Sequence, residues 1–209
     1  FTVLFDPLDG SSIVDVNFAF GSIFGVYNAG SLVGKTGNDQ IAACYAVYGP
    51  ATTFVVTFKN GTYEFRLGED GEFFLRHENL KVADEAAHFA PGNLRAAAER
   101  LDYLNLIEEW IKMGLTLRYS GGMVPDINHI ILKGNGIFSY PGYSKAPAGK
   151  LRLLFECAPM ALIMEQAQGV ASDGIMPILV KKITDLHQRT PIFLGSKNAV
   201  EKACRKLIN

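Results

Sequence analysis

The sequence predicts a mixed α/β protein in which layers of helix alternate with layers of sheet. In the first half, short runs of β-branched and aromatic residues are separated by glycine-containing turns, as in antiparallel strands. In the second half, apolar runs of strand length alternate with segments whose apolar residues recur with helical periodicity, which favours helices packed on a sheet. Because a polar connection at residues 78–87 separates the halves, we predict two subdomains, residues 1–85 and 86–209.

The first half is expected to be mostly strand. Residues 1–5 are interpreted as the end of a buried strand, and the aromatic, glycine-spaced residues 18–27 as a second, crowded strand. Residues 39–48 carry three alanines and are followed by Gly49-Pro50, so a short helix is predicted there. Three antiparallel strands joined by glycine turns follow, at residues 52–58, 62–67 and 72–77.

The second half is expected to alternate helix and strand. An amphipathic helix is predicted to bury one stripe of side chains: Leu101, Leu104, Ile107, Trp110 and Ile111. A second helix is predicted to begin near Pro125 and to end at Gly134, since proline suits a first helical turn and glycine a helix end. Strands are predicted at residues 136–140, 151–155 and 191–195, a buried helix at 156–168, and a last helix from 197 to about 208.

The composition is that of an ordinary globular protein. The 209 residues are 48% hydrophobic, and 20 basic against 21 acidic residues give a formal net charge of −1. This balance provides no general attraction to nucleic acids or acidic membranes. No apolar stretch is long enough to span a bilayer, and the three widely spaced cysteines indicate reduced thiols rather than a disulfide framework. We expect a soluble protein, located in the cytoplasm or a plastid.

The stretch Phe5-Asp6-Pro7-Leu8-Asp9-Gly10-Ser11-Ser12 is the strongest candidate for a functional site. Its strand delivers two carboxylates, Asp6 and Asp9, into a turn, because Pro7 cannot continue a hydrogen-bonded ladder. Gly10 permits a close backbone approach, and the N–H groups of Ser11 and Ser12 are free to point at an anion. A divalent cation such as Mg²⁺ reconciles carboxylates with a phosphate. For the five residues from Asp6 to Gly10 alone, an ordinary type I turn is the alternative.

Glu156 is the best candidate for a third carboxylate. It lies where an apolar strand is predicted to end and a buried helix to begin, and the helix N-terminus stabilises a carboxylate there. The alternative is a glutamate that starts a helix and has no further role. Lys150 and Arg152 bracket the same strand, and alternation places both on one face, where they could contact a phosphate. Solvated surface charge is the alternative for these two residues.

Several motifs together resemble one enzyme family. The string F-D-P-L-D-G-S-S is similar to the signature of the magnesium-dependent, lithium-sensitive sugar phosphatases, most closely the fructose-1,6- and sedoheptulose-1,7-bisphosphatases. Segments at residues 118–123, 136–141, 150–160 and 186–196 resemble further parts of the same enzymes. The likeness covers essentially the whole chain, and it implies the layered sugar-phosphatase fold.

The resemblance implies a role for each matching residue. Asp6, Asp9, Glu156 and the carbonyl of Leu8 would bind Mg²⁺, and Gly10, Ser11 and Ser12 would hold the phosphate that is cleaved. Two or three Mg²⁺ ions are expected per site, with part of their ligands upstream of this chain. The sugar and the distal phosphate would be lined by Lys150, Arg118, Tyr119, Met123 and Tyr140. For Met123 and Tyr140, core packing is the alternative. In fructose bisphosphatases the matching arginine comes from a neighbouring subunit, so a homo-oligomer, dimer or tetramer, is expected.

Three stretches favour one substrate within this family. Residues 12–18, 89–95 and 122–128 resemble those of sedoheptulose-1,7-bisphosphatases, and in the second stretch Asn93 and Arg95 are candidates for contacting the distal phosphate. We therefore expect a phosphoric monoester hydrolase that converts sedoheptulose 1,7-bisphosphate to sedoheptulose 7-phosphate and phosphate. A fructose-1,6-bisphosphatase is the alternative within the family. A non-catalytic relative that binds sugar phosphate is the alternative from a different functional class.

The chain opens abruptly within a strand, so we expect that an upstream segment is missing. In the enzymes that the chain resembles, further metal-binding acidic residues precede the D-P-L-D motif. The three carboxylates found here would hold one ion and part of a second. We therefore expect residues 1–209, expressed alone, to fold poorly or to bind sugar phosphate weakly without turnover.

Overall fold

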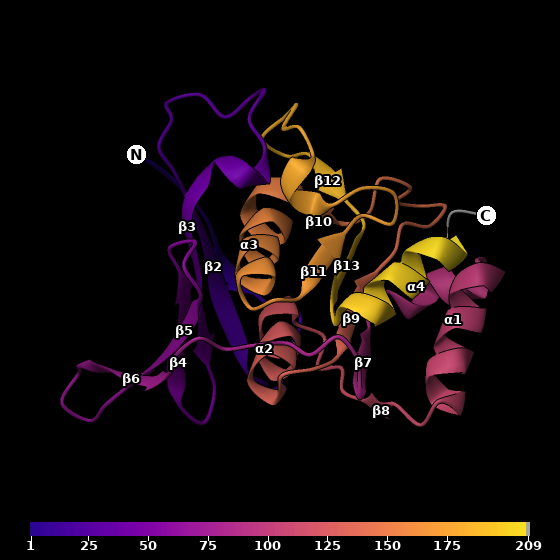
Figure 1. Cartoon of the computed structure of the whole chain (residues 1–209), viewed down its shortest axis with the longest axis horizontal. Coiled ribbons are helices and arrows are strands. Elements are labelled where there is room, and N and C mark those ends of the chain that lie inside the picture. The colour runs from indigo at the N-terminus through magenta and orange to yellow at the C-terminus, as the bar shows by residue number, and fades with distance from the viewer. Residues whose placement is uncertain (208–209) are drawn as a thin grey trace.

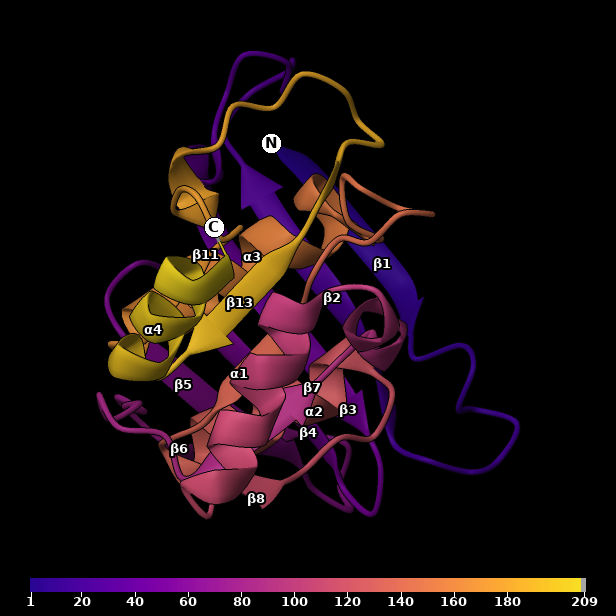
Figure 2. The ribbon, with the colours of Figure 1, turned by 90° about the vertical axis from the view of Figure 1, so that its right-hand side faces the viewer.

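Sheet and helix alternate in layers through residues 1–207, the part of the chain that the computed structural model describes (Figure 1). Helices α2 (Met123–Lys133) and α3 (Ala158–Gln166) lie between the two main sheets. Helices α1 (Leu101–Lys112) and α4 (Lys197–Leu207) cover the far side of the second sheet, and Figure 2 shows both from that side. The predicted mixed α/β fold with alternating layers is confirmed.

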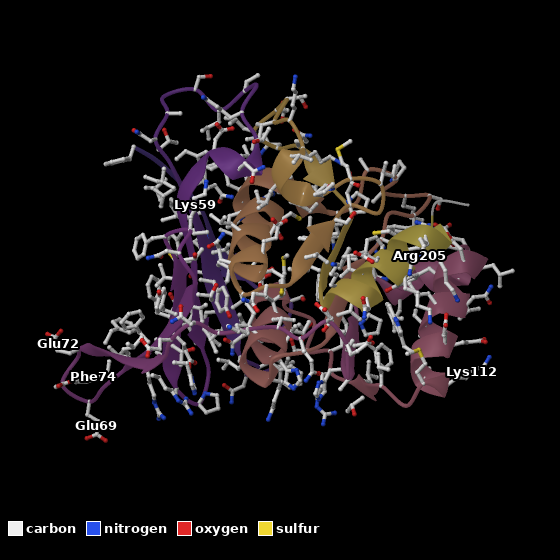
Figure 3. All side chains as sticks on the ribbon, in the orientation of Figure 1. Lys59, Glu69, Glu72, Phe74, Lys112 and Arg205 are labelled. Carbon is white, nitrogen blue, oxygen red and sulfur yellow. The ribbon has the colours of Figure 1, made fainter. Side chains whose placement is uncertain are left out.

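The first sheet consists of six antiparallel strands in sequence order. They are β1 (Thr2–Asp9), β2 (Phe20–Tyr27), β3 (Gln40–Tyr48), β4 (Thr52–Thr57), β5 (Thr62–Leu67) and β6 (Phe73–His77). Every residue of β6 is exposed, and the β5–β6 hairpin projects from the body of the molecule with Glu69, Glu72 and Phe74 near its tip (Figure 3). The strands predicted from residue 52 to residue 77 are confirmed.

Residues 40–48 form strand β3, so the short helix predicted at 39–48 is wrong. The strand pairs with β2 from Gln40 to Tyr48 and with β4 from Ala43 to Tyr48. Its alanines suit a helix locally, but here they alternate between the two faces of the sheet, and Ala43 lies in the core that includes α3. The side-chain amide of Gln40 donates to the carbonyl of Ala158 at 3.0 Å and joins this strand to the start of α3. Long-range pairing has overridden local propensity.

Strand β1 is interrupted where Pro7 lies. Asp6 pairs with Ile23 and Asp9 with Gly21, with an irregular register between the two pairs. Proline has no N–H to give to the ladder, which accounts for the irregularity at this position. The carbonyl of Pro7 instead accepts a hydrogen bond from the Ser22 hydroxyl at 2.8 Å. The strand therefore resumes after Pro7 rather than stopping there, and the bulge lies between the two aspartates.

The second sheet has five strands in the order β11-β13-β9-β7-β8 and is mixed parallel and antiparallel. Its members are β7 (His88–Pro91), β8 (Thr116–Leu117), β9 (Ile137–Tyr140), β11 (Val170–Ser172) and β13 (Ile192–Gly195). The predicted strands at residues 136–140 and 191–195 are confirmed.

The strand predicted at residues 151–155 is much shorter in the structure. Strand β10 (Leu151–Arg152) pairs with β12 (Arg189–Thr190), and the chain then enters a π-helical turn at Leu153–Cys157 that leads into α3. An apolar run of this length can be buried either as a strand or as part of a helix, so its composition does not distinguish the two. Glu156 consequently lies within the turn, one residue before the α-helix N-cap at Cys157.

Helix α1 buries a different stripe from the one predicted. The exposed fractions of Leu101 and Ile111 are 69% and 60%, whereas Tyr103, Leu106, Ile107 and Trp110 are buried. The Tyr103 hydroxyl accounts for the rotation, because it donates to the carbonyl of Gly92 at 2.9 Å and lies 2.9 Å from the Ser139 hydroxyl. A tyrosine with two buried partners therefore faces the sheet in place of a leucine.

One hydrophobic core spans both halves of the chain. It joins Tyr45 and Val55 of the first sheet to α2, α3 and Phe138 of the second. Helix α3 is buried on nearly every face, as the sequence predicted. The division into subdomains at residues 85 and 86 remains a prediction. Among the described residues, no helix is both long and apolar enough to cross a membrane.

We expect Gly21→Ala to destabilise the fold, because the added methyl would lie 2.4 Å from both the Ala46 carbonyl and the Val124 side chain. Such overpacking costs roughly 1–3 kcal/mol. The matched control is Gly30→Ala, whose methyl would meet nothing within 4 Å. Urea unfolding should show a lower midpoint for the first variant alone, and equal midpoints would contradict this account of how α2 packs on the sheet.

Candidate active site

A cavity of about 660 Å³ brings together most of the residues that the sequence singled out. They come from β1 and the loop after it, the start of α2, β9, and the segment from β10 to the π-helical turn. The predicted residues that line this cavity are Asp6, Leu8, Asp9, Gly10, Ser11, Ser12, Asn93, Arg95, Tyr119, Met123, Tyr140, Lys150, Arg152 and Glu156. Segments far apart in the sequence therefore meet here, although the role of each residue remains a prediction.

Three carboxylates cluster on one side of the cavity. Asp6, Asp9 and Glu156 each offer an oxygen within 4.8 Å of the others. Asp9 and Glu156 are only 7% and 9% exposed. Carboxylate oxygens are the ligands that hard divalent cations such as Mg²⁺ prefer, so this set of donors fits such an ion. Leu8, whose carbonyl is the fourth predicted ligand, also lines the cavity.

The Asp9 carboxylate also binds the start of helix α2. It accepts the N–H of Val124 at 2.6 Å and that of Met123 at 3.3 Å. These groups have no partner inside a helix, and the helix dipole favours a negative charge beside them. Asp9 therefore links β1 to the helix whose first residue, Met123, lines the same cavity.

Burial and repulsion between carboxylates make Asp9 and Glu156 hard to ionise in the ion-free protein. Burial raises the pKa of Asp9 to about 6, although the N–H groups of Val124 and Met123 act in the opposite direction. Burial raises the pKa of Glu156 to about 7, and repulsion from Asp6 and Asp9 adds to the increase. The Glu156 carboxylate is held by the N–H of Arg152 at 2.7 Å. A bound cation would offset both the burial of these charges and the repulsion between them.

The loop after the carboxylates is shaped for close approach. Gly10 has a φ of +89°, a conformation that other residues rarely adopt, and its carbonyl accepts the N–H of Ile13 at 2.9 Å. Ser11 and Ser12 are exposed at the mouth of the cavity. This arrangement suits the predicted binding of a phosphate by the loop.

The cavity wall also has a side that consists of cationic and aromatic residues. Asn93 adopts a left-handed backbone, and its side-chain amide donates to the carbonyl of Pro141 at 2.9 Å, so it fixes the loop that carries Arg95. Tyr119 and Tyr140 are partly buried, and burial raises the pKa of each phenol. Lys150 and Arg152 enter from β10 and the residue before it. This side therefore offers positive charge and hydroxyl groups to an anionic ligand.

Arg118 is the one predicted site residue that does not line this cavity. It is exposed just after β8, and its guanidinium donates to the carbonyl of Leu117 at 2.8 Å. This position neither supports nor contradicts a contribution to the site of a second subunit, so that role remains a prediction.

Sequence reasoning missed several cavity residues: Leu94, Gly121, Gly122, Phe138, Leu151 and Arg189. It also missed Asp126, which is 4% exposed and accepts the N–H of Ser120 at 2.7 Å, so it holds the loop before α2. Burial raises the pKa of Asp126 to about 7. An acidic residue in the first turn of a predicted helix was a usable signal for Asp126. Arg189 gave no such signal, because only strand pairing brings it to the site.

Comparison with known proteins identifies the family of both halves. The model of the fructose-1-6-bisphosphatase N-terminal domain matches residues 1–78, and that of the C-terminal domain matches residues 82–207. A chloroplastic sedoheptulose-1,7-bisphosphatase of Triticum aestivum is 49% identical over 202 residues, which cover 96% of this chain and 51% of the wheat protein. A class 1 fructose-1,6-bisphosphatase of Trichlorobacter lovleyi is 45% identical over 205 residues, covering 97% of this chain and 64% of that protein.

Comparison with solved structures gives relatives of the same kind. A crystal structure of a Toxoplasma gondii protein assigned as a sedoheptulose-1,7 bisphosphatase superimposes with a TM-score of 0.94 at 35% sequence identity. The match covers 99% of this chain and 69% of that one. The chain therefore spans between 51% and 69% of the length of these relatives.

We expect the thermal stability of the ion-free protein to fall as the pH rises from about 5 to about 8. A carboxyl whose pKa is higher in the folded than in the unfolded protein stabilises the fold only while it is protonated, and Asp9 and Glu156 both have raised pKa values. Added Mg²⁺ should restore stability near pH 8 and do little near pH 5, where protons compete with it. Melting curves at several pH values test this, and a Mg²⁺ effect that grew as the pH fell would contradict it.

Proposed function

The chain belongs to the fructose-1,6-bisphosphatase family, and from this premise we propose that it forms the active site of a metal-dependent sugar bisphosphatase. The observation that carries the proposal is that one cavity is lined both by three clustered carboxylates and by cationic residues. A site that only bound an anion would gain little from clustered acids, which repel it. The same acids become useful when they hold a cation between themselves and a phosphate.

In the proposed reaction, each part of the cavity has one task. Asp6, Asp9 and Glu156, with the Leu8 carbonyl, would hold Mg²⁺, which neutralises charge on the phosphoryl group and lowers the pKa of water. The N–H groups of Gly10, Ser11 and Ser12 would orient the phosphate to be cleaved. Hydrolysis forms a bond between phosphorus and a water oxygen and breaks the bond from phosphorus to the sugar oxygen, which leaves as the hydroxyl of the sugar product.

The far end of the substrate would lie against the cationic and aromatic side. Tyr119, Tyr140, Lys150 and Arg95 would bind the phosphate that is not cleaved and the sugar between the two phosphates. These contacts would position the ester without taking part in bond breaking. Arg152, whose N–H already binds Glu156, would lie closest to the carboxylate side.

We propose sedoheptulose 1,7-bisphosphate as the substrate, with its 1-phosphate as the group released. The support is the loop at residues 89–95, from which Asn93 and Arg95 reach the cavity. Fructose 1,6-bisphosphate is the alternative within the same chemistry, and the relatives named above include proteins of both kinds. The choice therefore rests on the loop rather than on overall similarity.

Phosphate release from both bisphosphates, with and without Mg²⁺, tests this function. We expect Mg²⁺-dependent turnover of both by the full-length protein, of which residues 1–209 expressed alone are expected to show none, with the higher kcat/KM for the sedoheptulose substrate. Glu156→Gln should lower kcat by roughly 100-fold or more, since it removes a charge that the metal needs. The matched control is Glu165→Gln on α3, outside the cavity. A higher kcat/KM for fructose 1,6-bisphosphate would leave only the general bisphosphatase assignment, and absence of turnover would favour a non-catalytic binder.

We also expect Arg118→Ala to raise KM for the bisphosphate more than it lowers kcat, because the proposed role is to anchor the phosphate that is not cleaved. Arg205→Ala on α4 is the control for loss of an exposed arginine. If Arg118 serves a neighbouring subunit, mixing Arg118→Ala with Asp9→Asn subunits should restore some activity. No recovery in a verified mixed oligomer would count against a shared site.

A further inference from the structure

Two arginines face each other across the short ribbon at the cavity wall. In the antiparallel pair of β10 and β12, Arg152 lies directly opposite Arg189, and both side chains line the cavity. The Cβ atoms of facing residues lie about 4.5–5.5 Å apart, and like charges at such positions are destabilising. Lys150, also in the cavity wall, adds a third positive charge beside them.

No acidic side chain compensates this charge by direct pairing. Within residues 1–207, Lys150, Arg152 and Arg189 form no ion pair, whereas Lys181 pairs with Asp173, and Lys202 and Lys206 both pair with Glu109. The guanidinium of Arg152 has the ring of Phe155 5.9 Å away, which is a weak interaction at an exposed site. The Glu156 carboxylate interacts electrostatically with Arg152, but three positive charges exceed this one carboxylate, so the ribbon favours a bound anion.

Arg189 is held in place instead of being free in solvent. Its guanidinium donates to the carbonyl of Lys150, and the next residue, Thr190, is fully buried. The N–H of Leu153 donates to the carbonyl of Gln188 at 2.7 Å, which extends the attachment of β12 to the segment that carries Glu156. A cation fixed in this way retains little freedom to move away from Arg152, so the repulsion is built into the fold.

We propose that Arg189 is a further substrate-binding residue, which binds together with Arg152 one phosphate group of the substrate. Guanidinium groups donate in a planar fork that matches phosphate oxygens, and one phosphate between two of them replaces repulsion by attraction. The identity of the phosphate as part of a sugar bisphosphate rests on the proposed function. The anion site itself rests only on the paired arginines and the cavity.

Binding of inorganic phosphate to the intact protein, with Mg²⁺ in every sample, tests the assignment by calorimetry and by melting temperature. We expect Arg189→Gln to weaken phosphate binding roughly tenfold, while the melting temperature without phosphate stays equal to that of the parent protein or rises. The glutamine side chain can still donate a hydrogen bond to the Lys150 carbonyl, but it lacks the positive charge of the guanidinium. Arg189→Lys should lose less affinity, and Arg76→Gln on the exposed strand β6 is the control.

The double variant Arg152→Gln/Arg189→Gln should lose less affinity than the two single losses combined, because both residues bind one group.

A purely structural Arg189 gives the opposite pattern. The melting temperature without phosphate would then fall and phosphate affinity would stay unchanged, which would overturn the proposal. An unchanged phosphate affinity with a rise in KM for the bisphosphate would also overturn it, since Arg189 would then act only by positioning Lys150. If the parent protein bound phosphate through Arg189 but hydrolysed neither bisphosphate, the function proposed above would fail and the anion site would stand.

Discussion

The contact between the Asp9 carboxylate and the first turn of α2 is the interaction on which the site depends. Asp9 belongs to the first sheet, and the N–H groups that it accepts, those of Met123 and Val124, belong to a helix of the second half of the chain. The same carboxylate lies within reach of Asp6 and Glu156. One side chain therefore joins the cluster that fits a metal to the segment that lines the rest of the cavity. Neither half of the cavity could shift without disturbing the other.

The electrostatics of the cavity follow from this arrangement. Negative charge gathers where β1 meets the π-helical turn, and positive charge gathers on the ribbon of β10 and β12. Each set is unfavourable by itself, as the raised pKa values of Asp9 and Glu156 indicate for the acids. In the proposed function, a divalent cation would relieve the repulsion on one side, and a phosphate would relieve it on the other. Preorganised charge of this kind is the usual basis of phosphoryl-transfer sites.

The errors of the sequence interpretation have a common cause. The alanines of β3 favour a helix locally, and the apolar run at residues 151–155 suits a strand and a buried helix equally well. In α1, a hydroxyl with two buried partners turned the helix away from the leucine stripe. In each case the deciding contact comes from a segment distant in the chain, so no local window contains the information.

The sequence by itself determined the layered fold class and most element positions, and it singled out the D-P-L-D-G-S-S stretch as the candidate site, because these depend on residue types within a few positions. It also singled out Glu156 as a candidate third carboxylate, and the structure brings this residue to Asp6 and Asp9, although its role as a metal ligand remains a prediction and the predicted strand end is a π-helical turn. Only the tertiary structure decided that Asp9 binds α2, that Arg118 lies outside the cavity and that Arg189 faces Arg152. These are consequences of strand pairing and packing across more than thirty residues of chain, and such partners are selected by the whole fold and not by the neighbouring sequence.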